Sequence, residues 1–308
     1  VLFTSCSDGK GGGGPEGSIT NCCGDLGPLN TRGLVAYYSF DGLDKTIEVG
    51  TEIKDRSGNG NDAKFKRMDP DNPIDKDIVD KDERYISVKK DGIIGDALYI
   101  AKYDYLAILD STTDKDFDFG TGDFTWSMWV KQTKNDTLND FANRVWFGAQ
   151  QSAASCGGGT HMWLGIHANT DNIVWQLRAV HNDPDSISRR KGYAHVALET
   201  EGLAEEWHHV TAVKDGHKYS NISIYIDGKE AKRYNAQIDS VKEDIPRDGK
   251  VGMHEDYIFS RIDCFYLGKF PVCPGYNTTF TMDEVSIWNR PLSEDEVEML
   301  YKAQKPEF

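Results

Sequence analysis

Side chains that could recognise a sugar alternate along the segment HMWLGIH. If this segment is a strand, His161, Trp163 and His167 lie on one face, because successive side chains of a strand point to opposite faces. An indole can stack on a pyranose ring, and Arg178 in the nearby run VWQLR would add a hydrogen-bond donor. The pattern predicts a carbohydrate-binding face, although the same residues could form a protein interface or pack beneath the loop SAASCGGGT.

The carboxylates of the chain do not show the arrangement of a glycosidase. Jellyroll glucanases place two carboxylates at alternating positions of one strand, so that both face the same sugar bond. The closest approach to this pattern is SEDEVE from Ser293, which falls on a predicted helix, where alternate side chains diverge around the axis. The sequence also lacks a G-x-S-x-G elbow, a Walker loop and an H-E-x-x-H motif. We therefore predict that the chain is not an enzyme.

Two adjacent histidines occur in the run WHHV. Alternation places Trp207 and His209 on one face of a strand, and His208 and Val210 on the other. Buried imidazoles usually have a hydrogen-bond partner and a structural role. We therefore predict a structural role for both histidines, not metal binding or catalysis.

The cysteines are even in number, and no C-x-x-C pair occurs, which favours disulfides over a zinc site. One disulfide could close a local hairpin, because two of the cysteines flank the segment FYLGKFPV. The pairing of the other four stays open. The six residues are Cys6, Cys22, Cys23, Cys156, Cys264 and Cys273.

Several features favour an extracellular or cell-surface protein. Sequons for N-glycosylation begin at Asn135, Asn221 and Asn277. The sequence contains no apolar run long enough to predict a membrane span. A net charge of −15 argues against nucleic-acid partners, which are bound by clustered Lys and Arg.

The chain divides near residue 32. Residues 1–32 are rich in glycine and lack a periodic apolar pattern, which predicts an extended arm or linker. Residues 33–308 contain short alternating runs separated by turn signals such as DG and SGNGN, which predict antiparallel strands. Ser293 and Glu296 form a capping box for one helix near the C-terminus, which we expect to cover an edge of the sandwich.

The order of these runs resembles the laminin-G-like jellyroll family, which is concanavalin A-like. The resemblance covers residues 33–303 and rests on GLVAYYSFDG, DRSGNGNDAKF, GIIGDALYIAKYDYLAI, FTWSMWVK, EEWHHVTAVKDG, ISIYIDGKEAKR and FTMDEVSIWNRPLSEDEVEMLY. It implies an all-β, antiparallel two-sheet jellyroll sandwich with a short C-terminal helix, preceded here by the arm. It also implies a binding or adhesion role and, commonly, one calcium ion.

The resemblance implies which residues would hold this ion. In the family, the acid after the first strand, the SGNGN loop and the acid of the last strand meet at one edge of the sandwich. Oxygen atoms of this kind suit Ca²⁺. The corresponding residues are Asp41, Asp55, Asn59, Asn61 and Asp283. Alternatively, Asn59 and Asn61 make an Asx turn and Asp283 accepts hydrogen bonds from a neighbouring loop.

Two functions follow from these expectations. The first is a non-catalytic, calcium-stabilised adhesion module that binds a glycan or a surface protein. The second is a self-assembling subunit of a cell-surface filament or coat, in which residues 1–32 add to the sheet edge of the next copy. The sequence does not choose between them, because a fold does not by itself assign a function.

Overall fold

The computed structural model describes separate segments between residues 31 and 305, which together make up about half of the chain. Residues 1–30 of the arm, His167, the three sequon asparagines and five cysteines lie outside the described residues; these cysteines are Cys6, Cys22, Cys23, Cys156 and Cys273. The predictions made for them therefore stay predictions. The described residues are 31–44, 46–67, 86–89, 92–101, 103–110, 115–119, 122–133, 144–150, 161–166, 172–178, 180–181, 198–199, 205–216, 222–231, 257–258, 262–270 and 279–305.

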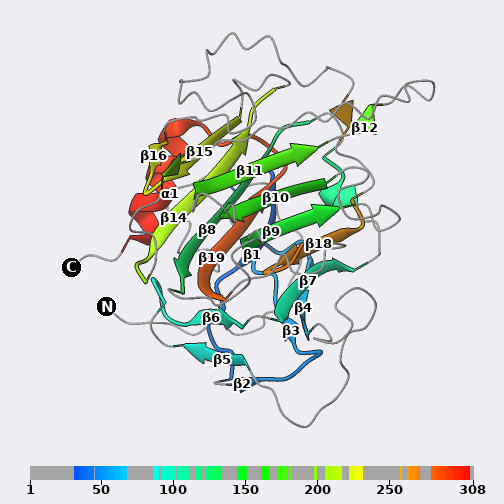
Figure 1. Cartoon of the computed structure of the whole chain (residues 1–308), viewed down its shortest axis with the longest axis vertical. Coiled ribbons are helices and arrows are strands. Elements are labelled where there is room, and N and C mark those ends of the chain that lie inside the picture. The colour runs from blue at the N-terminus through cyan, green and yellow to red at the C-terminus, as the bar shows by residue number, and fades with distance from the viewer. Residues whose placement is uncertain are drawn as a thin grey trace, which may run out of the picture.

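The strands form two large antiparallel sheets (Figure 1), as the alternating runs predict. The first sheet has nine strands, and its first strand by sequence, β1 (Leu34–Tyr38), pairs with its last, β19 (Phe280–Trp288). The other strands of this sheet follow the order β16 (Lys229–Glu230), β15 (Ile222–Ile226), β14 (His208–Lys214), β8 (Phe124–Gln132), β19, β6 (Ala97–Ile100), β5 (Ile86–Lys89) and β2 (Thr46–Ile47).

The second sheet faces the first and has eight strands. Its order is β13 (Leu198–Glu199), β11 (Asn172–Arg178), β10 (His161–Ile166), β9 (Arg144–Gln150), β18 (Cys264–Leu267), β7 (Asp104–Asp110), β4 (Ala63–Arg67) and β3 (Glu52–Ile53). A separate two-stranded sheet joins β12 (Val180–His181) to β17 (Tyr257–Ile258), and the 3₁₀ turn η2 spans Lys115–Phe117.

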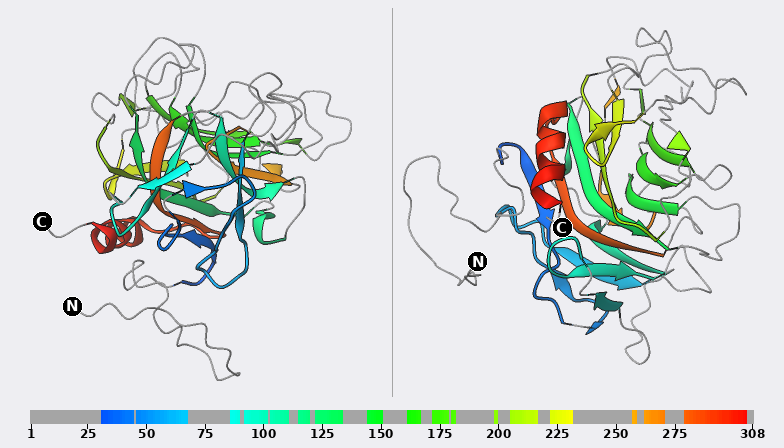
Figure 2. Two further views of the ribbon diagram at one scale, coloured as in Figure 1. Left: turned by 90° about the horizontal axis from the view of Figure 1, so that it is seen from below. Right: turned by 90° about the vertical axis from the view of Figure 1, so that its left-hand side faces the viewer.

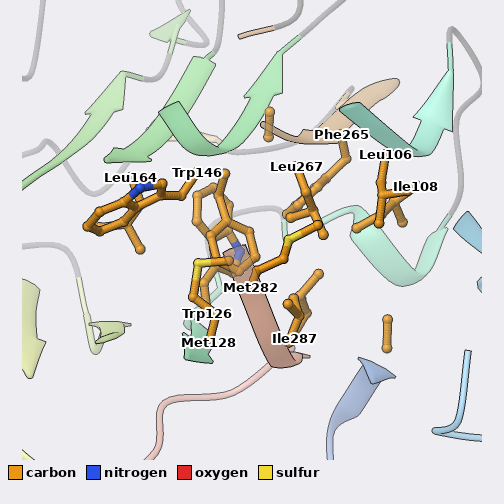
Figure 3. Packing of buried hydrophobic residues seen from close by; sticks show 14 of the residues in the cluster. Leu106, Ile108, Trp126, Met128, Trp146, Leu164, Phe265, Leu267, Met282 and Ile287 are labelled. Atoms are coloured by element: carbon orange, nitrogen blue, oxygen red, sulfur yellow. The ribbon is translucent and has the colours of Figure 1, made fainter. Parts of the chain in front are cut away.

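The core fills the space between the two sheets. Inward-facing side chains of both sheets meet there, including Trp126, Met282 and Ile287 from the first sheet and Trp146, Leu164 and Phe265 from the second (Figure 3). The Trp126 ring stacks on Phe147 at 5.3 Å between ring centroids. Burial of this apolar surface is the main force that holds the sheets together.

The single helix among the described residues is α1 (Glu294–Gln304), and its capping box is confirmed. The Ser293 side chain accepts a hydrogen bond from the Glu296 amide, and the Glu296 carboxylate accepts one from the Ser293 amide. The helix lies across the outer face of the first sheet (Figure 2), where Val297 and Leu300 pack with Trp288. The helix thus covers an apolar patch of the sheet face, and it also contacts β16, the edge strand of this sheet, as the expectation that it covers an edge implies.

Candidate functional site

Asp41 follows β1 and contacts the loop before β6. Its Oδ1 atom accepts a hydrogen bond from the Asp96 amide at 2.9 Å. A Cβ at Gly95 would lie 2.0 Å from this oxygen, and Gly95 has φ +64°. Glycine is needed at this position both for its backbone conformation and for the close approach of the carboxylate.

Asp283, from the other end of the chain, reaches the same loop. Its Oδ2 atom accepts hydrogen bonds from the amides of Ile93 and Ile94 at 2.9 and 3.2 Å. Its Oδ1 atom accepts one from the Glu284 amide at 2.9 Å. The loop at residues 92–96 therefore joins Asp41 and Asp283, although more than two hundred positions separate them in the sequence.

The environment of Asp283 is unfavourable for a negative charge. Burial raises the pKa of Asp283 well above its ordinary value of 3.8, and the charge of Asp41 raises it further, although the loop amides oppose this rise. Asp283 is fully buried and Asp41 is half-buried, so their negative charges repel each other unless a proton or a cation compensates them. Carboxylate oxygens in this arrangement are ligands of the kind that Ca²⁺ binds in proteins.

The remaining predicted metal ligands are directed at β1. Asp55 accepts hydrogen bonds from the amides of Tyr37 and Asn61 at 2.9 and 3.0 Å. The side-chain amides of Asn59 and Asn61 donate to the Val35 carbonyl at 3.0 and 2.8 Å. The predicted set of five residues is thus divided into an acid pair, Asp41 and Asp283, and a turn that fastens β1.

Within the part of the chain that the structure describes, no group of three or more His, Cys, Asp or Glu side chains is placed to hold a metal ion. An ion between Asp41 and Asp283 would therefore need backbone carbonyls or water as its other ligands, as Ca²⁺ commonly has in proteins.

A second buried acid, Glu284, was not identified from the sequence. A bulge in β19 gives Glu284 a φ of +51°, and the register against β8 shifts between Asp283 and Ser286. The Glu284 carboxylate accepts hydrogen bonds from the Tyr37 hydroxyl and from the Gln304 amide group of α1. The bulge thus connects the acid pair to the contact between α1 and the sheet.

The predicted sugar-binding residues lie on the outer face of the second sheet. Met162, Leu164 and Ile166 point into the core, so His161 and Trp163 point outward, as alternation predicts. However, Trp163 is only 4% exposed, and its indole N–H donates to the Gln176 side chain. In this conformation the ring packs with Val145, Val174 and Phe270.

The strand register shows which further residues lie beside His161 on the outer face of the second sheet, and the sequence alone did not reveal them. A row of paired positions crosses five strands of the second sheet, and directly paired residues share a face. Only the pairing of distant strands shows that these residues are neighbours. The row consists of Asp110, Cys264, Gln150, His161 and Arg178.

The two adjacent histidines have structural partners, as expected. His209 is fully buried, and a hydrogen bond of 2.9 Å joins its Nε2 atom to the Ser127 hydroxyl. Burial lowers the pKa of His209 to about 3. The Nδ1 atom of His208 contacts the Asp227 carboxylate at 2.9 Å, so both rings fasten β14 to its surroundings.

Comparisons with known proteins agree with the sandwich. The family model described as the concanavalin A-like lectin/glucanases superfamily matches residues 102–298. A search of curated proteins returned no match. Among the described residues, no helix has the length and apolar character needed to cross a membrane.

Solved structures of binding domains share the fold at low sequence identity. The binding domain of Paraclostridial Mosquitocidal Protein 1 has a TM-score of 0.53 and 15% identity, with coverage of 88% of this chain and 52% of that chain. Domain 4 of AbnA, an extracellular GH43 arabinanase from Geobacillus stearothermophilus solved with arabinotriose, has a TM-score of 0.50 and 17% identity, with coverage of 87% and 98%.

A third similar structure is the binding domain of botulinum neurotoxin DC in complex with rat synaptotagmin II. Its TM-score is 0.52 at 12% identity, with coverage of 90% of this chain and 53% of that chain. The chain thus spans about half the length of the toxin binding domains that it matches.

Proposed function

Because the chain belongs to the concanavalin A-like lectin/glucanase superfamily, we propose that it is a non-catalytic, extracellular binding module stabilised by calcium. The observation that carries the proposal is the meeting of Asp41 and Asp283 around the loop at residues 92–96. A Ca²⁺ ion there would neutralise two repelling carboxylates and would join the start and the end of the sandwich.

A chelator experiment tests the metal. The melting temperature of the wild type should fall when calcium is replaced by a chelator, because a ligand that binds only the folded state stabilises it. Asp283→Asn should remove this response. Asp55→Asn is the matched control, since it weakens the turn on β1 and leaves the acid pair intact, so that its response to calcium should persist.

Two results would contradict the calcium proposal. If the wild type has the same melting temperature in calcium and in chelator, calcium does not stabilise the folded chain. Loss of the calcium response in Asp55→Asn as well would show that the acid pair alone does not hold it.

The proposed ligand is a glycan or a surface protein. The solved structure of AbnA domain 4 with arabinotriose supports a sugar, since a domain with this fold holds one. The candidate residues predicted from the sequence are His161, Trp163, His167 and Arg178. Trp163 would have to be uncovered before a sugar could stack on it.

A glycan array compares Trp163→Ala with Val174→Ala, which removes packing from the same cluster and keeps the indole ring. Loss of signal only in Trp163→Ala supports this face as the binding surface. An unchanged profile in folded Trp163→Ala excludes it.

A further inference from the structure

The outer face of the first sheet continues beyond the C-terminal end of α1. Tyr301 of the helix covers Trp129 and His209, with ring centroids 5.6 and 5.9 Å away. Gln304, the last residue of α1, accepts a hydrogen bond from the Trp129 indole at 3.1 Å. The next outward side chains of β8 and β14 therefore lie past the end of the helix.

Four residues form a cross-strand row at this place. Thr281 of β19 is opposite Tyr99 of β6 on one side and opposite Lys131 of β8 on the other. Because His208 pairs with Val130, the preceding residue Trp207 follows Lys131 in the same row. We call Tyr99, Thr281, Lys131 and Trp207 the outer row.

The outer row faces away from the core. Its neighbours along the strands, Leu98, Val130 and Met282, belong to the hydrophobic core between the sheets. Alternation therefore directs the side chains of the outer row to the opposite face, which is the face that α1 covers farther along the strands (Figure 2).

Three residues of the outer row are more accessible than Trp163 on the face predicted from the sequence. Tyr99, Lys131 and Trp207 are half-buried, whereas Trp163 is 4% exposed and Thr281, within the row, is 5% exposed. The Lys131 ammonium group lies 5.9 Å from the centroid of the Trp207 ring, which holds the two side chains together at the end of the row.

We propose that the outer row is a binding surface for a neutral linear oligosaccharide, an inference that rests on the proposed binding function. Tyr99 and Trp207 offer aromatic faces on which sugar rings can stack, and Lys131 offers hydrogen bonds to hydroxyl groups. Apolar stacking combined with hydrogen-bond donors suits a ligand that has both C–H faces and hydroxyl groups.

The strand spacing sets the size of the ligand. Tyr99 lies on β6, and Trp207 lies just before β14, which is three strands away across β19 and β8. Neighbouring strands are about 4.8 Å apart, so the two rings are separated by about 14 Å. A single sugar cannot contact both rings, whereas an oligosaccharide laid across the strands can.

The charge of the protein selects a neutral ligand. The net charge of −15 repels polyanions such as sulfated glycans at long range. The single ammonium group of the row lies beside Trp207, which leaves no cluster of cations within the row to attract an acidic chain.

Titration calorimetry tests the proposal with arabinotriose, cellopentaose, glucose and arabinose on the full chain in the presence of calcium. Trp207→Ala and Tyr99→Ala should each weaken binding of an oligosaccharide by about tenfold. Met299→Ala is the matched control, because Met299 is exposed on α1 outside the outer row. The monosaccharides should bind at least about tenfold more weakly than the oligosaccharide.

The outcomes separate this proposal from the function on which it rests. If Trp163→Ala binds the oligosaccharide more weakly and Trp207→Ala binds it as the wild type does, the outer row is not the binding surface, but the chain is still a binding module. A tighter complex with heparin oligosaccharide than with any neutral sugar would overturn the ligand class. If the wild-type protein binds none of the neutral oligosaccharides, the outer-row proposal is wrong. A melting temperature that depends on calcium would still support the proposed function of a calcium-stabilised module.

Discussion

At the scale of single residues, Gly95 permits the approach of Asp41 to the loop before β6. Gly58 provides a comparison, since it also has a positive φ, +89°, but nothing lies within 4 Å of a Cβ built there. Substitution of either glycine by alanine costs about 1 kcal/mol for the left-handed backbone. Only at position 95 does the new methyl group collide with a carboxylate.

We therefore expect Gly95→Ala to lower the free energy of unfolding by clearly more than Gly58→Ala, and to reduce the stabilisation by calcium. Urea denaturation of both variants, with and without calcium, measures the two effects. Equal losses in the two variants would mean that Asp41 adapts to the methyl group without cost.

His209 should make stability depend on pH. Its folded pKa of about 3 lies below its ordinary value of 6.5, so the unfolded chain binds more protons between these values. The stability that comes from holding the ring neutral is present above pH 6.5 and is lost as the pH falls toward 3.

In this window the wild type should lose about 1 kcal/mol per pH unit more than His209→Gln, which does not titrate. Denaturant unfolding at several pH values between 3 and 7 gives the two slopes. Parallel slopes would contradict a neutral, buried His209.

At the scale of elements, the start of α1 combines several contacts. Arg290 forms an ion pair with Glu296 and donates to the Arg32 carbonyl at 2.7 Å, which links the helix to the chain before β1. Together with the Arg290 ion pair, the Ser293 amide lowers the pKa of Glu296, because hydrogen bonds to a carboxylate favour its charged form.

Ser293→Ala should destabilise the domain by about 1 kcal/mol, the usual cost of losing an N-cap side chain. Ser293→Asp should stay close to the wild type, since aspartate also caps helices. Thermal unfolding compares the variants. A stable Ser293→Ala would mean that packing of Val297 and Leu300 on the sheet fixes the helix without the cap.

The predictable elements are those with a local sequence signal. The capping box at Ser293 and the alternation of His161 and Trp163 need only neighbouring residues, and both are confirmed. The bulge at Glu284 has no such signal, because it depends on β19 changing partners from β6 to β1. For the same reason, the sequence did not show that Glu284 would meet Gln304.

At the scale of the whole molecule, the chain just before β1 is joined to the end of β19. The Leu34 amide donates to the Thr31 carbonyl, and the Asn289 amide donates to the Gly33 carbonyl at 2.8 Å. Residues 1–30 are rich in glycine and lack a periodic apolar pattern, so we expect a chain without them to keep the melting temperature of the full chain. A chain that lacks residues 1–38 should not fold, because it lacks β1.

Calorimetry and light scattering of both deletions measure folding and mass. A large fall in melting temperature after removal of residues 1–30 would show that they belong to the domain. If the full chain polymerises, a monomeric 1–30 deletion favours assembly through the arm, and continued polymerisation contradicts it.

The long-range part of the site was accessible to sequence reasoning only through the family resemblance. The resemblance paired Asp41 with Asp283, and the structure places both at one loop. It also added Asn59 and Asn61, whose side-chain amide nitrogens donate to the Val35 carbonyl; their assignment as metal ligands stays a prediction. The accessibility of Trp207 relative to Trp163 depends on the packing of the whole chain and has no local signature.

The antiparallel pairing of β1 with β19 has a mechanical consequence. Leu34 is opposite Trp288, so the strand that enters the sandwich and the strand that leaves it meet at the same end of the pair. A tensile load applied through flanking segments would pull these two strands apart from that end and break their hydrogen bonds one after another. Resistance to such a load would therefore fall first on Arg290, which fastens the chain before β1 to the helix after β19.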